Sequence, residues 1–291
     1  MNRLPVATWN PLGVNYAPAS AALPDLPAEG WAQAEALSPA LPAGVTAAAD
    51  FGDFAASGMG AETDAWLADN ANLVNHLAAA GKADTPVVFE TALDAAHPHA
   101  LTYLTIDATE GSELTIVQVV RGDAENGVSA NLTRIRAAEN SHVTLVQVQL
   151  LGNNARRWNA VAIEEAKSAR VEHVRIELGG CVVACGARAV LDHNKCEYDL
   201  DAVYFGHGED VLDFNDVSVH TGKDTLCEMH TAGVLTGHAE KILRGTVDFQ
   251  RGAKRGVGHE SEDVLLFSPD ARNRTAPLIL CGEEEVEGQH A

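Results

Sequence analysis

The sequence has 291 residues, enough for one large domain with a sizeable core. Its formal net charge of -21, from 41 acidic against 20 basic residues, excludes nucleic acid and anionic lipid surfaces as main partners. No apolar run approaches the roughly 18 residues of a membrane span, and the N-terminus lacks the continuous apolar segment of a signal peptide. We therefore expect a cytoplasmic protein without membrane contact.

Residues 1–84 predict a small N-terminal region of short helices and irregular structure, rich in Ala and Pro. Apolar residues near helical spacing follow in residues 60–84, which predicts a helix that Gly81 ends. The apolar positions of this helix are Trp66, Leu67, Leu73, Val74 and Leu77. His76 lies within the same pattern, and we interpret it as a helix-surface or packing histidine rather than a ligand.

Residues 85–291 predict strands, because short runs rich in β-branched residues alternate with turn residues and no convincing helix interrupts them. Strands without crossover helices exclude a doubly wound α/β sheet and leave a sandwich, a barrel or a solenoid. Runs centred on His173, Leu200, Val219 and Asp248 recur at roughly 20 to 30 residues, the length of one solenoid coil. This spacing favours a β-solenoid over a sandwich.

The cysteines favour reduced thiols over a disulfide framework, because an odd number is scattered through the second half of the chain. They are Cys181, Cys185, Cys196, Cys227 and Cys281. The C-x3-C pair and the nearby His193 leave a zinc site conceivable. Structural zinc sites usually have two close pairs with tighter spacing, so we interpret these cysteines mainly as core thiols.

Three segments carry a resemblance to a known family. They are "LPVATWNPLGVN" at the start, "DVSVHTGKDTLCEMHTAGVL" at residues 216–235, and residues 243–291. In this order they resemble the SufD branch of the SufB/SufD family of iron-sulfur cluster assembly scaffold proteins. The resemblance implies a right-handed parallel β-helix with a small N-terminal helical region. In such a fold we expect inward-facing apolar residues to stack coil upon coil, among them Val217, Val219, Val247 and Phe249.

The resemblance also implies a function. The chain would be a non-catalytic scaffold subunit that pairs with SufB through the final coils and acts with the ATPase SufC. No G-x-x-x-x-G-K-[ST] motif occurs, so any ATP chemistry is expected in another subunit. Some complexes of the family associate with reduced flavin, but no residue identifies a flavin site.

The family pattern identifies His290 as a residue that helps to hold a transient iron-sulfur cluster opposite a SufB cysteine. Imidazole is a suitable ligand for iron and is largely neutral at cytosolic pH. Gly288 stands where SufB-type sequences usually have their cysteine. Cys281 is a weaker candidate, interpreted first as a core thiol. His259 and Glu260 are interpreted as a polar turn with surface hydrogen bonds.

Two departures from the family affect the expected partners. The sequence reads Gln289-His290-Ala291 where the family has Asn-His-Gly, and it stops before the C-terminal helical region that docks SufC. We therefore expect a C-terminally short SufD-like chain whose binding to SufC is open and for which a homodimer is an alternative.

The alternative function is a β-helix polysaccharide lyase or hydrolase, which would need paired carboxylates. Residues 192–201 supply Asp192, Glu197, Asp199 and Asp201, of which the last three fall on one strand face about 7 Å apart at each step. A solvent-facing acidic ladder explains the same pattern. With 5% aromatic residues for sugar stacking and no secretion signal, the sequence disfavours the enzyme.

Overall fold

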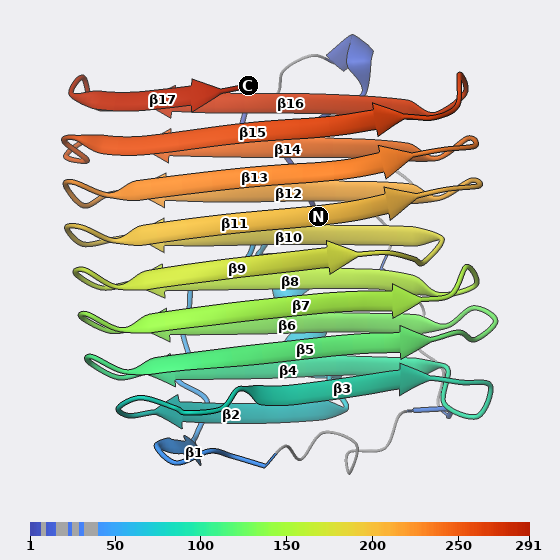
Figure 1. Ribbon diagram of the computed structural model, residues 1–291, viewed down its shortest axis with the longest axis horizontal. Helices are drawn as coiled ribbons and strands as arrows, with labels where there is room; N and C mark the ends of the chain where they lie inside the picture. The colour runs from blue at the N-terminus through green and yellow to red at the C-terminus, as the bar shows by residue number, and fades with distance from the viewer. Residues whose placement is uncertain (7–9, 16–22, 25–28, 32–39) are drawn as a thin grey trace.

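A computed structural model describes residues 1–6, 10–15, 23–24, 29–31 and 40–291. Within these residues the chain forms a β-solenoid of about eight turns, in which successive strands alternate between two facing sheets (Figure 1). Each coil thus contributes one strand to each sheet. The predicted mainly β, parallel solenoid is confirmed.

The nine-stranded sheet, here sheet A, contains the even-numbered strands and β1. Its spatial order is β1 (Val45–Ala47), β2 (Leu73–Ala79), β4 (His99–Ala108), β6 (Val128–Ala137), β8 (Arg156–Glu165), β10 (Val182–Leu191), β12 (Val211–His220), β14 (Glu240–Phe249) and β16 (Arg272–Cys281). All neighbours pair in parallel except β1, which is antiparallel to β2.

The eight-stranded sheet, sheet B, contains the remaining strands, all paired in parallel. It comprises β3 (Val87–Leu93), β5 (Glu113–Gly122), β7 (His142–Leu151), β9 (Arg170–Glu177), β11 (Glu197–Gly206), β13 (Leu226–Leu235), β15 (Gly256–Leu266) and β17 (Val286–His290). A 3-10 turn, η1 (Asn10–Leu12), and a helix, α2 (Ala61–Asn70), are the described helical elements. Neither is long and apolar enough to cross a membrane.

One corner of the solenoid is built from a stack of turns that each need a left-handed residue. Five non-glycine residues occupy this position in successive coils with φ between 55° and 63°: Asn140, Ser168, Lys195, Asp224 and Arg255. The backbone N–H of each donates to a carbonyl in the turn of the next coil, at 2.5 to 3.1 Å. These bonds pair backbone groups of the turns that have no partner in either sheet. The hydrogen bonding between successive coils therefore continues through the corner.

The interior between the sheets holds the main apolar core, which includes Val247 and Phe249 as expected. Val217 and Val219 do not share that face. Their strand β12 alternates, and the residues paired with Val247 and Phe249 are Ser218 and His220. The expectation failed for these two valines because sheet A is covered on both faces, so alternation alone does not tell the inner face from the outer one.

The N-terminal region supplies this outer cover. Met59 and Leu67 pack with Leu101, Leu132 and Trp158 on the outer face of sheet A. Strands β6, β8 and β10 are consequently buried on nearly every residue. Their sequences therefore lack the alternation by which the strands of sheet B are recognised.

The helix predicted over residues 60–81 is correct only as far as Asn70. Leu73, Val74 and Leu77 belong instead to β2, the first strand to pair in parallel in sheet A, upstream of residue 85. Leu73 and Leu77 are four residues apart, a spacing that fits one face of either a helix or a strand. His76 therefore lies on a strand, with its Nδ1 2.8 Å from Oγ1 of Thr105, and Gly81 is part of the following turn.

Candidate functional site

The predicted site residues lie in the last coil, formed by β16 and β17 (Figure 1). β17 pairs with β15 such that His290 lies beside Glu260. The backbone N–H of Ala291 donates to the carbonyl of Glu260, and the N–H of Glu262 donates to the carbonyl of Ala291. The backbone of His290 is thus fixed by strand pairing, while its side chain is exposed.

Cys281 is exposed at the end of β16, which corrects its interpretation as a core thiol. It pairs with Phe249, a core residue of the preceding coil. Because β16 is the outermost described strand of sheet A, no further described strand covers this position. The sequence pattern of an apolar strand ending in cysteine could not distinguish an inner coil from the last one.

His290 and Cys281 do not converge. The two strands run in opposite directions across the solenoid (Figure 1) and meet where Gly288 faces Ile279. A Cβ on Gly288 would lie 2.9 Å from Cγ2 of Ile279, so the packing there favours glycine. His290 and Cys281 lie two residues to either side of this contact, a separation of about 13 Å along the strands.

No group of three or more His, Cys, Asp or Glu side chains among the described residues is arranged to hold a metal ion. The conceivable zinc site does not form. Cys185 is buried inside the solenoid with its thiol 3.4 Å from Oε1 of Glu177, whereas the thiols of Cys181 and Cys196 donate to backbone carbonyls. Burial raises the pKa of the Cys185 and Cys227 thiols, which disfavours the thiolate that a metal requires.

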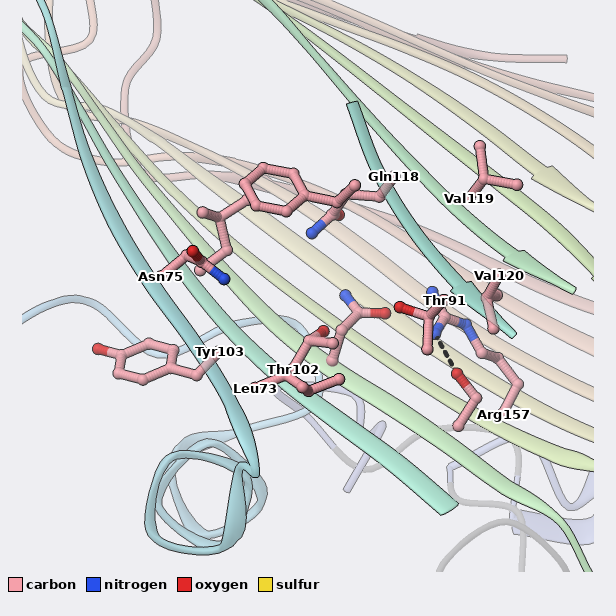
Figure 2. A pocket seen from close by; sticks show the side chains of 13 residues that line it. Leu73, Asn75, Thr91, Thr102, Tyr103, Gln118, Val119, Val120 and Arg157 are labelled. Carbon is pink, nitrogen blue, oxygen red and sulfur yellow. Dashed lines mark hydrogen bonds between the residues drawn. The ribbon is translucent and has the colours of Figure 1, made fainter. Parts of the chain in front are cut away.

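A small cavity lies inside the first coils, where Asn75, Thr91, Gln118 and Arg157 converge from both sheets (Figure 2). The Nη1 of Arg157 donates to Oγ of Ser129 at 2.8 Å. The cavity volume is about 30 Å³, room for water but not for a cluster or an organic ligand. This cavity is therefore part of a polar interior rather than a substrate site.

A second cluster of polar side chains lies inside the solenoid, between strands β14, β15 and β16. Lys241 pairs with Glu262, and Glu262 also accepts a hydrogen bond from Thr275. Burial lowers the pKa of Lys241 to about 7 and raises the pKa of Glu260 to about 7, although each opposes the other's shift. Sequence reasoning missed these groups. Glu260, expected in a surface turn, is a buried strand residue, whereas His259 lies 2.9 Å from Glu228 on the outside.

Three of the four carboxylates of the alternative function, those of Glu197, Asp199 and Asp201, lie on the outer face of sheet B. Asp199 accepts a hydrogen bond of 2.9 Å from Nη2 of Arg170, and Glu197 lies 4.0 Å from the same guanidinium. Asp192 lies apart, at a turn, where it accepts a hydrogen bond from Thr221. A ladder partly neutralised by Arg170 lacks the free pair of carboxylates that glycoside cleavage needs, so the enzyme is not favoured.

Comparison with known proteins gives two matches. Residues 91–291 match the family model described as "SUF system FeS cluster assembly, SufBD core domain". The chain is also similar to "Iron-sulfur cluster assembly protein SufD" of Bacillus subtilis (strain 168), with 29% identity over 93 residues. This match covers 32% of the chain and 21% of that relative, so the aligned part spans about a fifth of the relative's length.

Proposed function

Because the chain belongs to the SufB/SufD family of iron-sulfur cluster assembly proteins, we propose that it is a SufD-like scaffold subunit that pairs with a SufB-like partner. In this role it does not catalyse a reaction itself, and ATP hydrolysis belongs to a SufC-like subunit. The observation that carries the proposal is the exposed His290 on an ordered outermost strand.

His290 supplies one ligand to a cluster that is cargo rather than a resident cofactor. Its imidazole is a suitable ligand for iron, and strand pairing through Glu260 and Ala291 holds its backbone in place. Since the described residues form no complete set of ligands, the remaining ligands come from the partner. Cys281 is too far from His290 to share a cluster with it and is a secondary candidate for capturing iron.

The partner also covers an apolar patch on the same side of the solenoid, about 17 Å or more along β15 from the residue that pairs with His290. Leu265, Leu266 and Phe267, at the end of β15, are 60%, 53% and 70% exposed. Three consecutive exposed apolar residues beside the outermost strands are typical of a protein-protein contact. A SufB-like β-helix docked against the last coil would bury this patch and face His290.

Co-expression with the SufB-like and SufC-like proteins of the same organism tests the proposal. The complex is sized by light scattering after size exclusion, and its iron and sulfide are quantified. We expect the wild-type chain to form a heteromer that carries iron. With His290→Ala, the heteromer should keep the same subunits but contain less iron. Gln289→Ala, on the opposite face of the same strand, is the matched control.

Two results would contradict the proposal. A chain that elutes alone or as a homodimer would disprove pairing. Unchanged iron and sulfide in the His290→Ala complex would remove His290 from the cluster site while leaving the pairing intact.

A further inference from the structure

A cavity of about 440 Å³ opens on the outer face of sheet A, where none of the cluster-site residues lies. One wall is formed by β10, β12 and β14, and the other by residues 1–5 and 56–63, which include the start of α2. Its volume lies within the range of small-molecule sites. The cavity thus lies between the N-terminal region and sheet A, and it is large enough for a small metabolite.

The start of α2 presents unused hydrogen-bond donors to this cavity. The N-cap residue is Gly60, which has no side chain, and no side-chain cap replaces it. Asp64 does not fill this role, since its carboxylate accepts hydrogen bonds from the backbone N–H and the hydroxyl of Ser57. Within the described part of the chain, no acceptor receives the backbone N–H groups of residues 61–63. An uncapped helix N-terminus attracts anions.

Two buried side chains in the opposite wall provide independent support for a ligand. Thr246 is fully buried and Asn215 is 2% exposed, and both line the cavity. Oγ1 of Thr246 and Oδ1 of Asn215 have no hydrogen-bond partner among the described residues. The Nδ2 of Asn215 donates to the carbonyl of Gly58 at 2.6 Å, which holds the amide in place. Buried polar atoms in proteins are normally paired, so a bound water or ligand would account for the missing partners of these two atoms.

Two basic and two acidic side chains line the cavity. Arg3 and Arg188 both line it, in a chain whose net charge is -21. Glu62 and Asp248 line it as well, and Asp248 already accepts a hydrogen bond from Gln250 at 2.6 Å. Guanidinium groups recognise phosphate and carboxylate oxygens by charge-assisted hydrogen bonds. The side chains that line the cavity thus carry no net formal charge, and Arg3 and Arg188 are the two groups that can receive an anion.

We propose that this cavity binds a small organic anion of the size of a glycerol or sugar phosphate. Its anionic group lies at the N-terminus of α2 between Arg3 and Arg188, and its hydroxyl groups contact Asn215 and Thr246. The bound molecule bridges the N-terminal region and sheet A, so it stabilises the cover against the solenoid. The site does not depend on the proposed cluster function.

Isothermal titration calorimetry with three probes tests the site: inorganic phosphate, glycerol 3-phosphate and citrate. We expect millimolar or tighter binding of at least one organic anion, with a raised melting temperature. A stronger response to glycerol 3-phosphate identifies a phosphate ligand, and a stronger response to citrate identifies a carboxylate ligand. No heat and no thermal shift with any of the three probes would overturn the proposal.

Variants locate the binding in the cavity. Arg188→Gln and Thr246→Val are expected to weaken the binding at least tenfold while circular dichroism shows the native fold. Arg272→Gln removes the same charge from an exposed position on β16 and is expected to leave the affinity unchanged. Equal affinity in all three variants would show that the anion binds elsewhere and would refute the site.

Discussion

Arg175 of β9 and Asp216 of β12 face each other across the inside of the solenoid and are joined by two hydrogen bonds of 2.7 Å. Both side chains are at most 3% exposed, and the guanidinium lies 5.0 Å from the ring centre of Phe214. Burial opposes the charge of Arg175, but Asp216 outweighs it and raises the pKa of the guanidinium. The pair therefore ties sheet A to sheet B in the middle of the fold.

Arg175→Met is expected to lower the free energy of unfolding by about 3 to 5 kcal/mol, because it leaves the carboxylate of Asp216 buried and unpaired. The double variant Arg175→Met with Asp216→Leu should recover most of this loss. Urea unfolding measures both. Arg121→Gln, which breaks an exposed ion pair with Glu90, is the control and should cost less than about 1 kcal/mol. A loss no larger than this control would contradict the role assigned to the buried pair.

Stability is expected to fall with acid because of His220. Burial lowers the pKa of this histidine to about 4, whereas the unfolded chain has a pKa of about 6.5. Between these values the unfolded state binds the proton and the folded state does not. The contribution of His220 is therefore complete above pH 6.5 and is lost as the pH falls towards 4, at about 1.4 kcal/mol per pH unit.

The urea midpoint measured between pH 7 and pH 4 checks this slope. In His220→Gln the dependence of the unfolding free energy on pH should be smaller than in the wild type, by the uptake of about one proton on unfolding. Gln289→Ala, which removes no titratable group from an exposed position, serves as the control and should not change the slope. An unchanged slope in His220→Gln would show that His220 takes up its proton equally in both states.

Gly245→Ala is expected to destabilise the fold by about 1 to 3 kcal/mol through overpacking. A Cβ at this position would collide with the carboxyl group of Glu260, which lies against the glycine. Adding Glu260→Ala should relieve the collision, so the double variant should lose less stability than the sum of the two single variants. If the stability loss of the double variant equalled the sum of the two single losses, Gly245 and Glu260 would not be in contact.

Thiol titration with a colorimetric disulfide reagent is expected to show Cys281 reacting first in the native protein. Its side chain is exposed, while Cys185, Cys196 and Cys227 are buried. Cys281→Ser should remove the fast phase, and the buried thiols should react only after unfolding. A fast phase that survives in Cys281→Ser and also in Cys281→Ser with Cys181→Ser, which removes the partly buried thiol, would mean that a core cysteine is accessible.

Phe267→Asp is expected to weaken binding to the SufB-like partner at least tenfold without changing the stability of the isolated chain, because Phe267 is exposed at the last coil. Leu150→Asp, an exposed apolar residue of β7 in the middle of the solenoid, is the matched control. Affinity is measured by surface plasmon resonance. Equal effects of the two changes would place the interface elsewhere.

The strands of sheet B are easier to predict from the sequence than those of sheet A. β7 alternates buried and partly exposed residues along its length, because one face meets the core and the other meets water. β8 has no such alternation, since the N-terminal region covers its outer face. A cover formed by residues distant in sequence cannot be read from the strand itself. The strands of sheet A are for this reason harder to predict from their own sequence.

The polar side chains inside the solenoid could not be predicted from the sequence either, because their partners are also distant in sequence. In β9, His173, Arg175 and Glu177 take three of the four buried positions, while Val174 and Ile176 lie on the outer side and are only partly buried. Hydropathy alone predicts the reverse. The partners that make these polar groups tolerable come from other coils. His290, in contrast, was found through its resemblance to the family, and its role in binding a cluster stays a prediction.

The coil-by-coil pairing also sets how tightly different parts of the chain are held. In a solenoid each coil contacts only its neighbours, so an outermost coil has half the support of an inner one. Strand β17 pairs with β15 over only five residues, compared with ten for β13 and β15. Amide hydrogen exchange should therefore be fastest there. Among the described coils, the segment that carries His290 is therefore expected to open more readily than the strands between two neighbours.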